Sequence, residues 1–254
     1  MTKTKKNDFI ILIVWNIIAF TLSFIIGINY IITAVLFFLI PSIYISLKNK
    51  DLIKKSTLFS ILFSTPTVVI FSYLAHKDGA WKNYSIINLY IFNTYPIDDF
   101  IWGILYVYYM VIFYEYFFDK NKKHIPNIFY KFIKALTIIT LSFLLLIILI
   151  PQFYIPYVYI LGVLTMFILL PCIILINYKK IMQKLTPFLF YFFYMFMLYE
   201  YVANIKGNWS FPGQHFIGHF KIFSISFPLE EFLWALLAAP AVIVYYEFFA
   251  DDRK

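Results

Sequence analysis

Charged side chains are scarce in this chain: only 13% of its 254 residues are Asp, Glu, Lys or Arg, whereas 63% are hydrophobic. A water-soluble domain of this size needs far more polar surface to cover its core. Long polar, serine-rich or charged stretches, which would mark a linker or a second soluble domain, are absent as well. The composition therefore excludes an ordinary soluble enzyme and predicts one domain whose solvent is the lipid bilayer.

Cysteine is rare and cofactor motifs are missing. Cys172 is the single cysteine, and because it lies in an apolar segment without metal-ligating neighbours we expect a buried thiol. The sequence has no GxGxxG, no phosphate-binding loop and no Asp-rich prenyl-diphosphate motif. His215 and His219 have the spacing of metal ligands, but Pro212 and Gly213 favour a loop there rather than a helical metal site. We therefore expect no metal and no cofactor.

Long hydrophobic runs are what the sequence has instead. Eight of them are about 18 to 25 residues long, the length a helix needs to cross roughly 30 Å of hydrocarbon. They lie at 9–29, 30–47, 57–75, 97–118, 133–150, 153–177, 185–203 and 227–249. The first run follows three lysines, as in a secretory signal, but it is too long and ends without a small-residue cleavage site. The sequence therefore predicts an all-α, multi-pass membrane protein with about eight transmembrane helices.

The basic residues predict the orientation of these helices, because loops rich in lysine and arginine stay on the cytoplasmic side. Seventeen of the 21 basic residues precede the first span or follow an even-numbered span, and only Lys77, Lys82, Lys206 and Lys221 lie in the other loops. Both ends of the chain are therefore expected in the cytoplasm, with the protein in the cell membrane. This partition explains the net charge of +8 without a nucleic-acid partner. Every lysine lies in a loop or at a span boundary, which disfavours an opsin-like function.

A duplication divides the chain into two halves. Residues 96–102 (PIDDFIW) match residues 228–234 (PLEEFLW), and Tyr114-Glu115 matches Tyr246-Glu247 at the same offset. Upstream, residues 79–81 (GAW) match residues 207–209 (GNW). We infer two four-helix repeats, 1–125 and 126–254, within one integrated membrane domain. Because each repeat has an even number of spans, the repeats are parallel and related by a pseudo-two-fold axis along the membrane normal.

Acidic residues inside the spans are the main candidates for chemistry, since an ionisable group in a membrane is costly and usually functional. Each repeat is expected to begin its fourth helix with an acidic pair, Asp98 and Asp99 or Glu230 and Glu231, just inside the outer interface. For either pair alone, stabilisation of the helix N-terminus is a sufficient explanation, but the recurrence favours a shared site. Glu200, toward the outer end of the seventh span, joins these candidates; the alternative is a protonated structural side chain.

Tryptophans accompany the acidic pairs. Trp102 and Trp234 each follow by one helical turn, so they share a helix face with the first acid of the pair. Aromatic faces beside carboxylic acids suit a site that donates a proton and tolerates a cation. Glu115 and Glu247, near the inner ends of spans four and eight, are expected instead to be solvated at the interface.

The repeated motif resembles that of the small membrane lycopene cyclase domains of bacteria, archaea and fungi, a family unrelated to the flavin-dependent cyclases. The mark of this family is Pro-x-Glu-Glu-x-Leu/Phe-Phe/Trp at the start of a helix, preceded by an acidic residue and a Gly-x-Trp loop. Residues 228–234, residues 207–209 and Glu200 fit this pattern. In the first half, Asp98 and Asp99 replace the glutamates and Ser72 replaces the preceding acid.

The resemblance implies cyclisation of the linear end groups of lycopene or a related acyclic carotenoid, with no cofactor and no net redox change. A carboxylic acid would protonate the terminal double bond, the neighbouring alkene would attack the cation, and a base would remove a ring proton. The implied acid and base are among Glu230, Glu231, Asp98, Asp99 and Glu200, with roles not assigned. The implied substrate-binding side chains are Trp102, Trp234, Trp209, Trp81, Phe100 and Phe232. The implied partners are the lipid bilayer, the carotenoid and other enzymes of carotenoid synthesis.

Two other functions fit the same residues. A carrier for a lipid or another apolar solute would use the acids as a proton relay, although the acids lie near one interface rather than at mid-membrane. A non-catalytic subunit of a carotenoid-synthesis complex would keep the fold without the chemistry. The aspartates that replace glutamates in the first half favour this subunit reading.

Overall fold

The computed structural model describes residues 2–26, 29–83, 85–119, 126–177, 182–222 and 225–251. Within these ranges, eight helical runs are long and apolar enough to cross a membrane. The helical class and the eight long apolar helices predicted from the sequence are therefore confirmed. The runs are α1 (Lys3–Ile26), α2 (Tyr30–Ala34) with η1 (Val35–Leu39) and α3 (Ile40–Lys48), η2 (Lys50–Leu52) with α4 (Ile53–Asp78), α5 (Asp98–Phe118), α6 (Asn127–Leu149), α7 (Val158–Gly162) with η3 (Val163–Leu169) and α8 (Leu170–Asn177), α9 (Met182–Ile205), and α10 (Leu229–Tyr245) with η5 (Tyr246–Ala250).

Several span boundaries differ from those predicted. The third span begins at Lys50 instead of residue 57, because hydropathy marks only the apolar part of a helix that continues through polar residues. The sixth span begins at Val158 instead of residue 153. Tyr157, the residue just before this helix, has a left-handed backbone conformation with φ 58°, so the helix does not extend toward residue 153. The two acidic pairs do lie at helix starts as predicted, because α5 begins at Asp98 and α10 begins just after Pro228.

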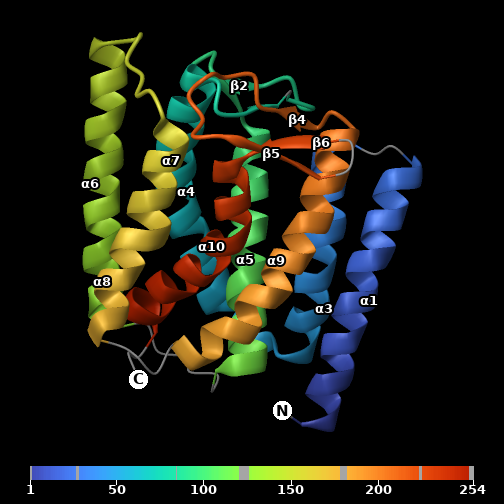
Figure 1. The fold of residues 1–254 in the computed structure, drawn as a ribbon. Helices are drawn as coiled ribbons and strands as arrows, with labels where there is room; N and C mark the ends of the chain where they lie inside the picture. Colours follow the sequence, from blue (N-terminus) through green and yellow to red (C-terminus); the bar gives the residue numbers. More distant parts are fainter. Residues whose placement is uncertain are drawn as a thin grey trace.

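Four helices, α4, α5, α9 and α10, form the centre of the bundle (Figure 1). α5 packs against both α4 and α10, and α10 packs against α9. α1 lies on one flank against α9, and α6 lies on the other flank against α4 (Figure 1). These two flanking helices expose most of their apolar side chains, as expected for surfaces that face lipid.

The thiol of Cys172 is exposed on α8, so the expectation of a buried thiol is wrong. α8 packs against η3 and α10, and Cys172 lies on the face of the helix directed away from them. In a protein whose surface is apolar, an apolar sequence around a residue does not show whether that residue points to the core or to lipid.

Among the described residues, six short strands cover one end of the bundle, which we call the strand end, and the start of α1 and the end of η5 lie at the opposite, terminal end (Figure 1). The strands pair two by two: β1 (Lys82–Asn83) with β4 (Trp209–Ser210), β2 (Tyr90–Ile91) with β3 (Tyr95–Pro96), and β5 (His219–Ile222) with β6 (Ile225–Pro228). Lys82 lies opposite Ser210 in the first pair. This pair joins the loop that follows α4 to the loop that follows α9.

Gly79 and Gly213 meet beside the β1–β4 pair. The Gly213 amide donates to the Gly79 carbonyl over 2.8 Å, and Gly79 has φ 73°, a conformation that favours glycine. A Cβ on Gly213 would lie 2.8 Å from the Gly79 carbonyl oxygen. The backbones of the two loops are therefore too close for any side chain at position 213.

We expect Gly213→Ala to destabilise the fold by about 1–3 kcal/mol, the usual cost of inserting a methyl group where the backbone must move. Thermal unfolding of the purified protein in detergent measures this effect. Gly218→Ala is the matched control, because its added Cβ would meet only the flexible end of the Leu229 side chain at 3.0 Å. Equal melting temperatures for the two variants would show that the Gly79–Gly213 contact is unimportant.

Candidate functional site

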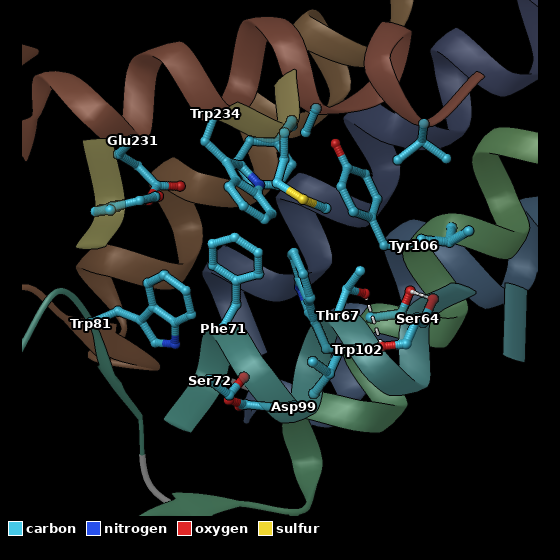
Figure 2. A pocket seen from close by; sticks show the side chains of 18 of the residues that line it. Ser64, Thr67, Phe71, Ser72, Trp81, Asp99, Trp102, Tyr106, Glu231 and Trp234 are labelled. Carbon is cyan, nitrogen blue, oxygen red and sulfur yellow. Dashed lines mark hydrogen bonds between the residues drawn. The ribbon is translucent and has the colours of Figure 1, made fainter. Parts of the chain in front are cut away.

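A cavity of about 140 Å³ lies inside the bundle toward the strand end. Its walls are mostly aromatic and aliphatic, and the only acidic side chains among the described residues that line it are Asp99 and Glu231. No lysine or arginine is among these lining residues. Figure 2 shows the two carboxyl groups apart on the cavity wall, Glu231 on α10 and Asp99 on α5, with Trp81 and Phe71 between them in this view and Trp234 beside Glu231.

Helical periodicity brings matching residues of α5 and α10 into this cavity. On α5, Asp99 and Trp102 are followed at spacings of four by Tyr106 and Met110, so all four lie on one face of the helix. Eleven residues of α-helix rise by about 16 Å, so the cavity follows α5 from its first turn to mid-helix. On α10 the lining residues are Glu231, Trp234, Ala238 and Val242. These lie at the offset that relates the two acidic pairs in the sequence.

Four tryptophans proposed from the sequence as substrate-binding residues line the cavity: Trp81, Trp102, Trp209 and Trp234. Trp102 is the centre of this group, with its ring 6.5 Å from the rings of both Trp209 and Trp234. Phe100 and Phe232 are not among the lining residues. Phe100 packs against Tyr95 at 6.2 Å, and Phe232 packs against Phe193 and Phe220 at 5.5 and 5.3 Å.

Glu200 and Glu231 form a carboxyl pair at the edge of the cavity. Both are buried, with 1% and 6% of their surface exposed, and their carboxyl groups lie near each other. Two buried carboxylates at close range repel each other when both are ionised, so the pair favours a state in which they share one proton. Glu200 Oε1 also accepts from Asn204 Nδ2 at 2.6 Å and from Trp209 Nε1 at 2.8 Å, and Tyr159 donates to Glu231. The pair can therefore hold one proton in a buried position beside the aromatic lining of the cavity.

Asp99 has different surroundings. Its Oδ1 accepts from Asn83 Nδ2 at 2.7 Å, and Ser72 lies beside it (Figure 2). Asn83 Oδ1 in turn contacts His76 Nε2 at 2.9 Å. Asp99 is thus connected to hydrogen-bond donors, and in the described part of the chain no second carboxyl group is hydrogen-bonded to it. These donors favour the ionised form of a carboxyl group.

Asp98 and Glu230, the first acids of each pair, are fully buried but do not line the cavity. Glu230 Oε1 accepts from the Ile217 amide at 2.7 Å, which ties α10 to the segment before β5. Neither oxygen of Asp98 has a hydrogen-bond partner among the described residues. In the described part of the chain, none of the four paired acids accepts from an amide of its own helix. Helix capping by hydrogen bonds therefore does not explain the pairs, although the helix dipole still favours their charge.

Comparison of this chain with protein-family models, with curated proteins and with solved structures finds no match. Functional inference therefore depends on the residues of the cavity itself. Reasoning from the sequence did not single out Tyr159, His76 or Asn83. Tyr159 is one of 22 tyrosines and carries no local signal, whereas Asn83 follows the Gly-x-Trp loop by two residues and is detectable from that position.

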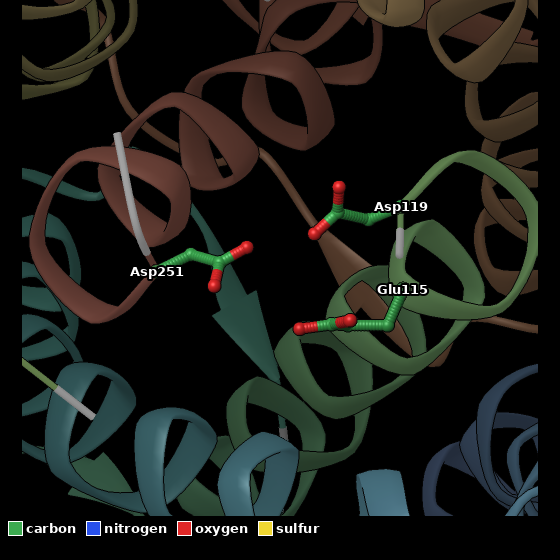
Figure 3. Close-up of side chains that lie close together, drawn as sticks. All are labelled: Glu115, Asp119 and Asp251. Atoms are coloured by element: carbon green, nitrogen blue, oxygen red, sulfur yellow. The ribbon is translucent and has the colours of Figure 1, made fainter. Parts of the chain in front are cut away.

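A second cluster of acids, drawn in Figure 3, lies where α5 and η5 end, toward the terminal end of the bundle. Candidate ligand oxygens of Glu115, Asp119 and Asp251 lie within 4.8 Å of one another. Lys55 Nζ already donates to Glu115 at 3.1 Å and to Asp251 at 2.6 Å. Because an ammonium group supplies the positive charge there, this cluster is better described as an ion-pair network than as a metal centre.

His215 lies in a loop and bonds to Asp78 at 2.5 Å, and His219 begins β5, so the loop predicted around these histidines is confirmed for His215.

Tyrosines extend this network across the bundle. Tyr246 donates to Glu115 and Tyr114 donates to Glu247, while Lys184 donates to Glu247 at 3.4 Å. Glu115 and Glu247 are 0% and 1% exposed, so the expectation of interfacial solvation is wrong for both. They are buried because tyrosines and lysines from neighbouring helices replace water as their partners. Burial also raises the pKa of Asp251, which follows the last span, to about 7.

We expect Lys55→Met to destabilise the protein by about 3–5 kcal/mol, since it leaves Glu115 and Asp251 buried without their ammonium partner. Thermal unfolding in detergent measures the loss. Lys54→Met, which changes the adjacent exposed lysine, is the control and leaves the melting temperature unchanged. A network without structural importance would give the same small effect in both variants.

Glu200→Gln keeps the acceptor for Asn204 and Trp209 and replaces the shared proton by an amide donor to Glu231. We therefore expect a melting temperature at pH 8 at least as high as that of the wild type. Glu200→Met leaves two buried donors without an acceptor, which costs about 1–3 kcal/mol for each. If both substitutions lowered stability equally, the proton-sharing description of Glu200 and Glu231 would be incorrect.

Proposed function

We propose that this protein is a membrane carotenoid cyclase, an isomerase that closes the linear end group of an acyclic carotenoid such as lycopene by proton transfer. The observation that carries the proposal is the pair of unlike acid sites that lie apart on the wall of one aromatic cavity, Glu231 with Glu200 and Asp99 with Asn83. Cyclisation needs one acid and one base. An apolar cavity with two acids in different surroundings supplies both.

The size of the cavity supports a substrate that enters by one end. A cavity of roughly 150 Å³ lined by aliphatic and aromatic side chains holds benzene, and this one measures about 140 Å³. It therefore suits a single ring-sized end group and not a complete polyene. The rest of the carotenoid would lie between the helices and the lipid, its natural solvent.

In the proposed reaction, Glu231 gives the proton that it shares with Glu200 to the terminal double bond of the end group. The tertiary cation that results is attacked by the neighbouring double bond, which forms the ring bond and moves the positive charge into the ring. Asp99 then accepts a proton from a carbon next to this charge, and a ring double bond forms. One proton is added and one is lost, so neither an oxidant nor a reductant is needed.

The aromatic walls support the cationic intermediates of this reaction. Ring faces attract a positive charge within about 6 Å, and Trp102, Trp234 and Trp81 surround the space between the two acids. Asp98 and Glu230 lie behind the walls, where we assign them to positioning of the helix starts. Exclusion of water prevents hydroxide or water from capturing the cation.

We further propose that the two halves of the sequence, 1–125 and 126–254, are parallel repeats that build this site together, with both ends of the chain in the cytoplasm of the cell. Reciprocal contacts support this arrangement: α1 packs against α9 as α6 packs against α4. Tyr114 bonds to Glu247 as Tyr246 bonds to Glu115. Asp99 comes from the first half and Glu231 from the second, so neither half would be active alone. Other carotenoid-synthesis enzymes are the proposed partners, because they supply the acyclic substrate.

Expression in bacteria that accumulate lycopene tests this proposal, with pigments separated by chromatography. We expect the wild type to convert lycopene into a monocyclic or bicyclic product. Glu231→Gln and Asp99→Asn should reduce conversion by at least ~100-fold, the scale of a lost general acid or base. Glu230→Gln and Asp98→Asn, which change the neighbouring acids outside the cavity, should retain more activity than their partners.

The amount of inserted protein must be equal in all strains. Unchanged lycopene with a well-inserted wild-type protein would contradict the enzyme proposal and favour the carrier or the non-catalytic subunit. Full activity of both Glu231→Gln and Asp99→Asn would contradict the assignment of acid and base.

A further inference from the structure

His76 lies between the cavity and a second, more polar hollow at the strand end of the bundle. This hollow is lined by polar residues that include Lys77, Asp78, Lys82 and His215. His76 lines the hollow and is only partly buried, whereas Asn83, to which it bonds, lines the cavity. One histidine and one asparagine therefore connect the open hollow to the buried Asp99.

The contacts of His76 depend on where its protons are. Its Nδ1 lies 2.9 Å from the backbone carbonyl oxygen of Ser72, and its Nε2 lies 2.9 Å from Asn83 Oδ1. Carbonyl oxygens only accept hydrogen bonds, so both contacts are hydrogen bonds only when both ring nitrogens carry a proton. The orientation of the Asn83 amide follows from its other bond, because its Nδ2 donates to Asp99 Oδ1. This chain of bonds is complete when His76 is positive and Asp99 is negative.

A second arrangement of the same three side chains is also fully bonded. If Asp99 carries a proton, it can donate to Asn83 Oδ1 once the amide has turned over. Asn83 Nδ2 then donates to Nε2 of a neutral His76, whose Nδ1 still donates to Ser72. With a proton on neither group, two acceptors face each other at His76. With a proton on both, Asp99 Oδ1 can still accept from Asn83, but the O–H must lie on Oδ2, which has no hydrogen-bond partner among the described residues, so a buried donor is left unpaired.

We propose that His76, acting through Asn83, is a positioning residue that holds Asp99 in its ionised, proton-accepting form and couples the charge of Asp99 to that of a ring exposed to the polar hollow. This inference rests on the proposed function of Asp99 as the base. It explains why the acids of the two halves have different hydrogen-bond partners. In the second half, Asn204 and Trp209 donate to Glu200, and none of the histidines that the structure describes is hydrogen-bonded to Glu200 or Glu231.

Other charged or titratable groups face the hollow or His76 from the packed elements. They are Asp99 from α5 with the neighbouring Asp98, Tyr90 from β2, Tyr95 from β3 with its ring 6.2 Å from that of His76, Lys82 from β1, Lys77 and Asp78 from the end of α4, and His215. Asp78 is bonded to His215, and Tyr95 has a pKa raised by its burial and stays neutral. Asp99 is therefore the carboxylate that is linked to His76 through an unbroken hydrogen-bond path.

A carbodiimide, which modifies protonated buried carboxyl groups, tests the coupling without any need for cyclase activity. Purified protein is treated at pH 7 and the modification of Asp99 is measured by peptide mass spectrometry. We expect little modification in the wild type and severalfold more in His76→Gln and in Asn83→Leu. His215→Gln removes the other histidine of the hollow and should leave the wild-type level unchanged. The melting temperature of each variant shows whether it is folded.

Nitrogen NMR of protein labelled at histidine gives the reciprocal measurement, since a coupling must act equally in both directions. We expect both ring nitrogens of His76 to be protonated in the wild type at pH 7 and one of them to lose its proton in Asp99→Asn. A neutral His76 in the wild type, or equal modification of Asp99 in folded His76→Gln and wild type, would overturn the inference. If instead the wild type fails to cyclise lycopene while both coupling results hold, the proposed function fails and the coupling stands.

Discussion

A carboxyl group inside a bundle of apolar helices is stabilised when it shares its charge or its proton with a neighbouring group, because lipid provides neither water nor counter-ions. This constraint explains more of the molecule than any single hydrophobic contact. Asp8 inside α1 accepts from Tyr44 at 2.5 Å and from Tyr116 at 2.6 Å, and lies 3.3 Å from Lys48. The helices are therefore joined at defined points by acids whose partners come from other helices, whereas apolar packing alone would allow many arrangements.

The two ends of the bundle satisfy the constraint in different ways. At the terminal end, Lys55 and Lys184 form ion pairs with Glu115, Asp251, Asp119 and Glu247, and these ion pairs serve stability. At the cavity, no lysine or arginine is among the described lining residues. The acids there hold a proton between two carboxyl groups or receive donors from Asn83, and such groups can exchange protons with a substrate. The same residue types thus support structure at one end and the proposed chemistry at the other.

The sequence predicted much of this fold, because span length and the scarcity of charge are set directly by the thickness and polarity of a membrane. Through the duplicated motif it also singled out Asp99, Glu231, Trp102 and Trp234, which line the cavity. The orientation of each side chain was not predictable. Cys172, expected to be buried, faces outward, and Glu115 and Glu247, expected to be solvated, are buried, because helices surrounded by lipid do not show the alternation of polar and apolar faces that marks the core of a soluble protein. Partners distant in sequence, such as Tyr159 for Glu231 and His76 for Asp99 by way of Asn83, appear only when the helices are packed.

Proton transfer through the cavity is the central claim, and solvent deuterium measures it most directly. Purified protein in lipid vesicles is supplied with lycopene in deuterated buffer without nucleotide, flavin or metal, and the product is analysed by mass spectrometry. The acid at Glu231 and Glu200 exchanges with the buffer, so each ring formed should carry a single deuterium at the carbon that was protonated. A cyclic product without deuterium, or cyclisation that depends on an added redox cofactor, would contradict the account.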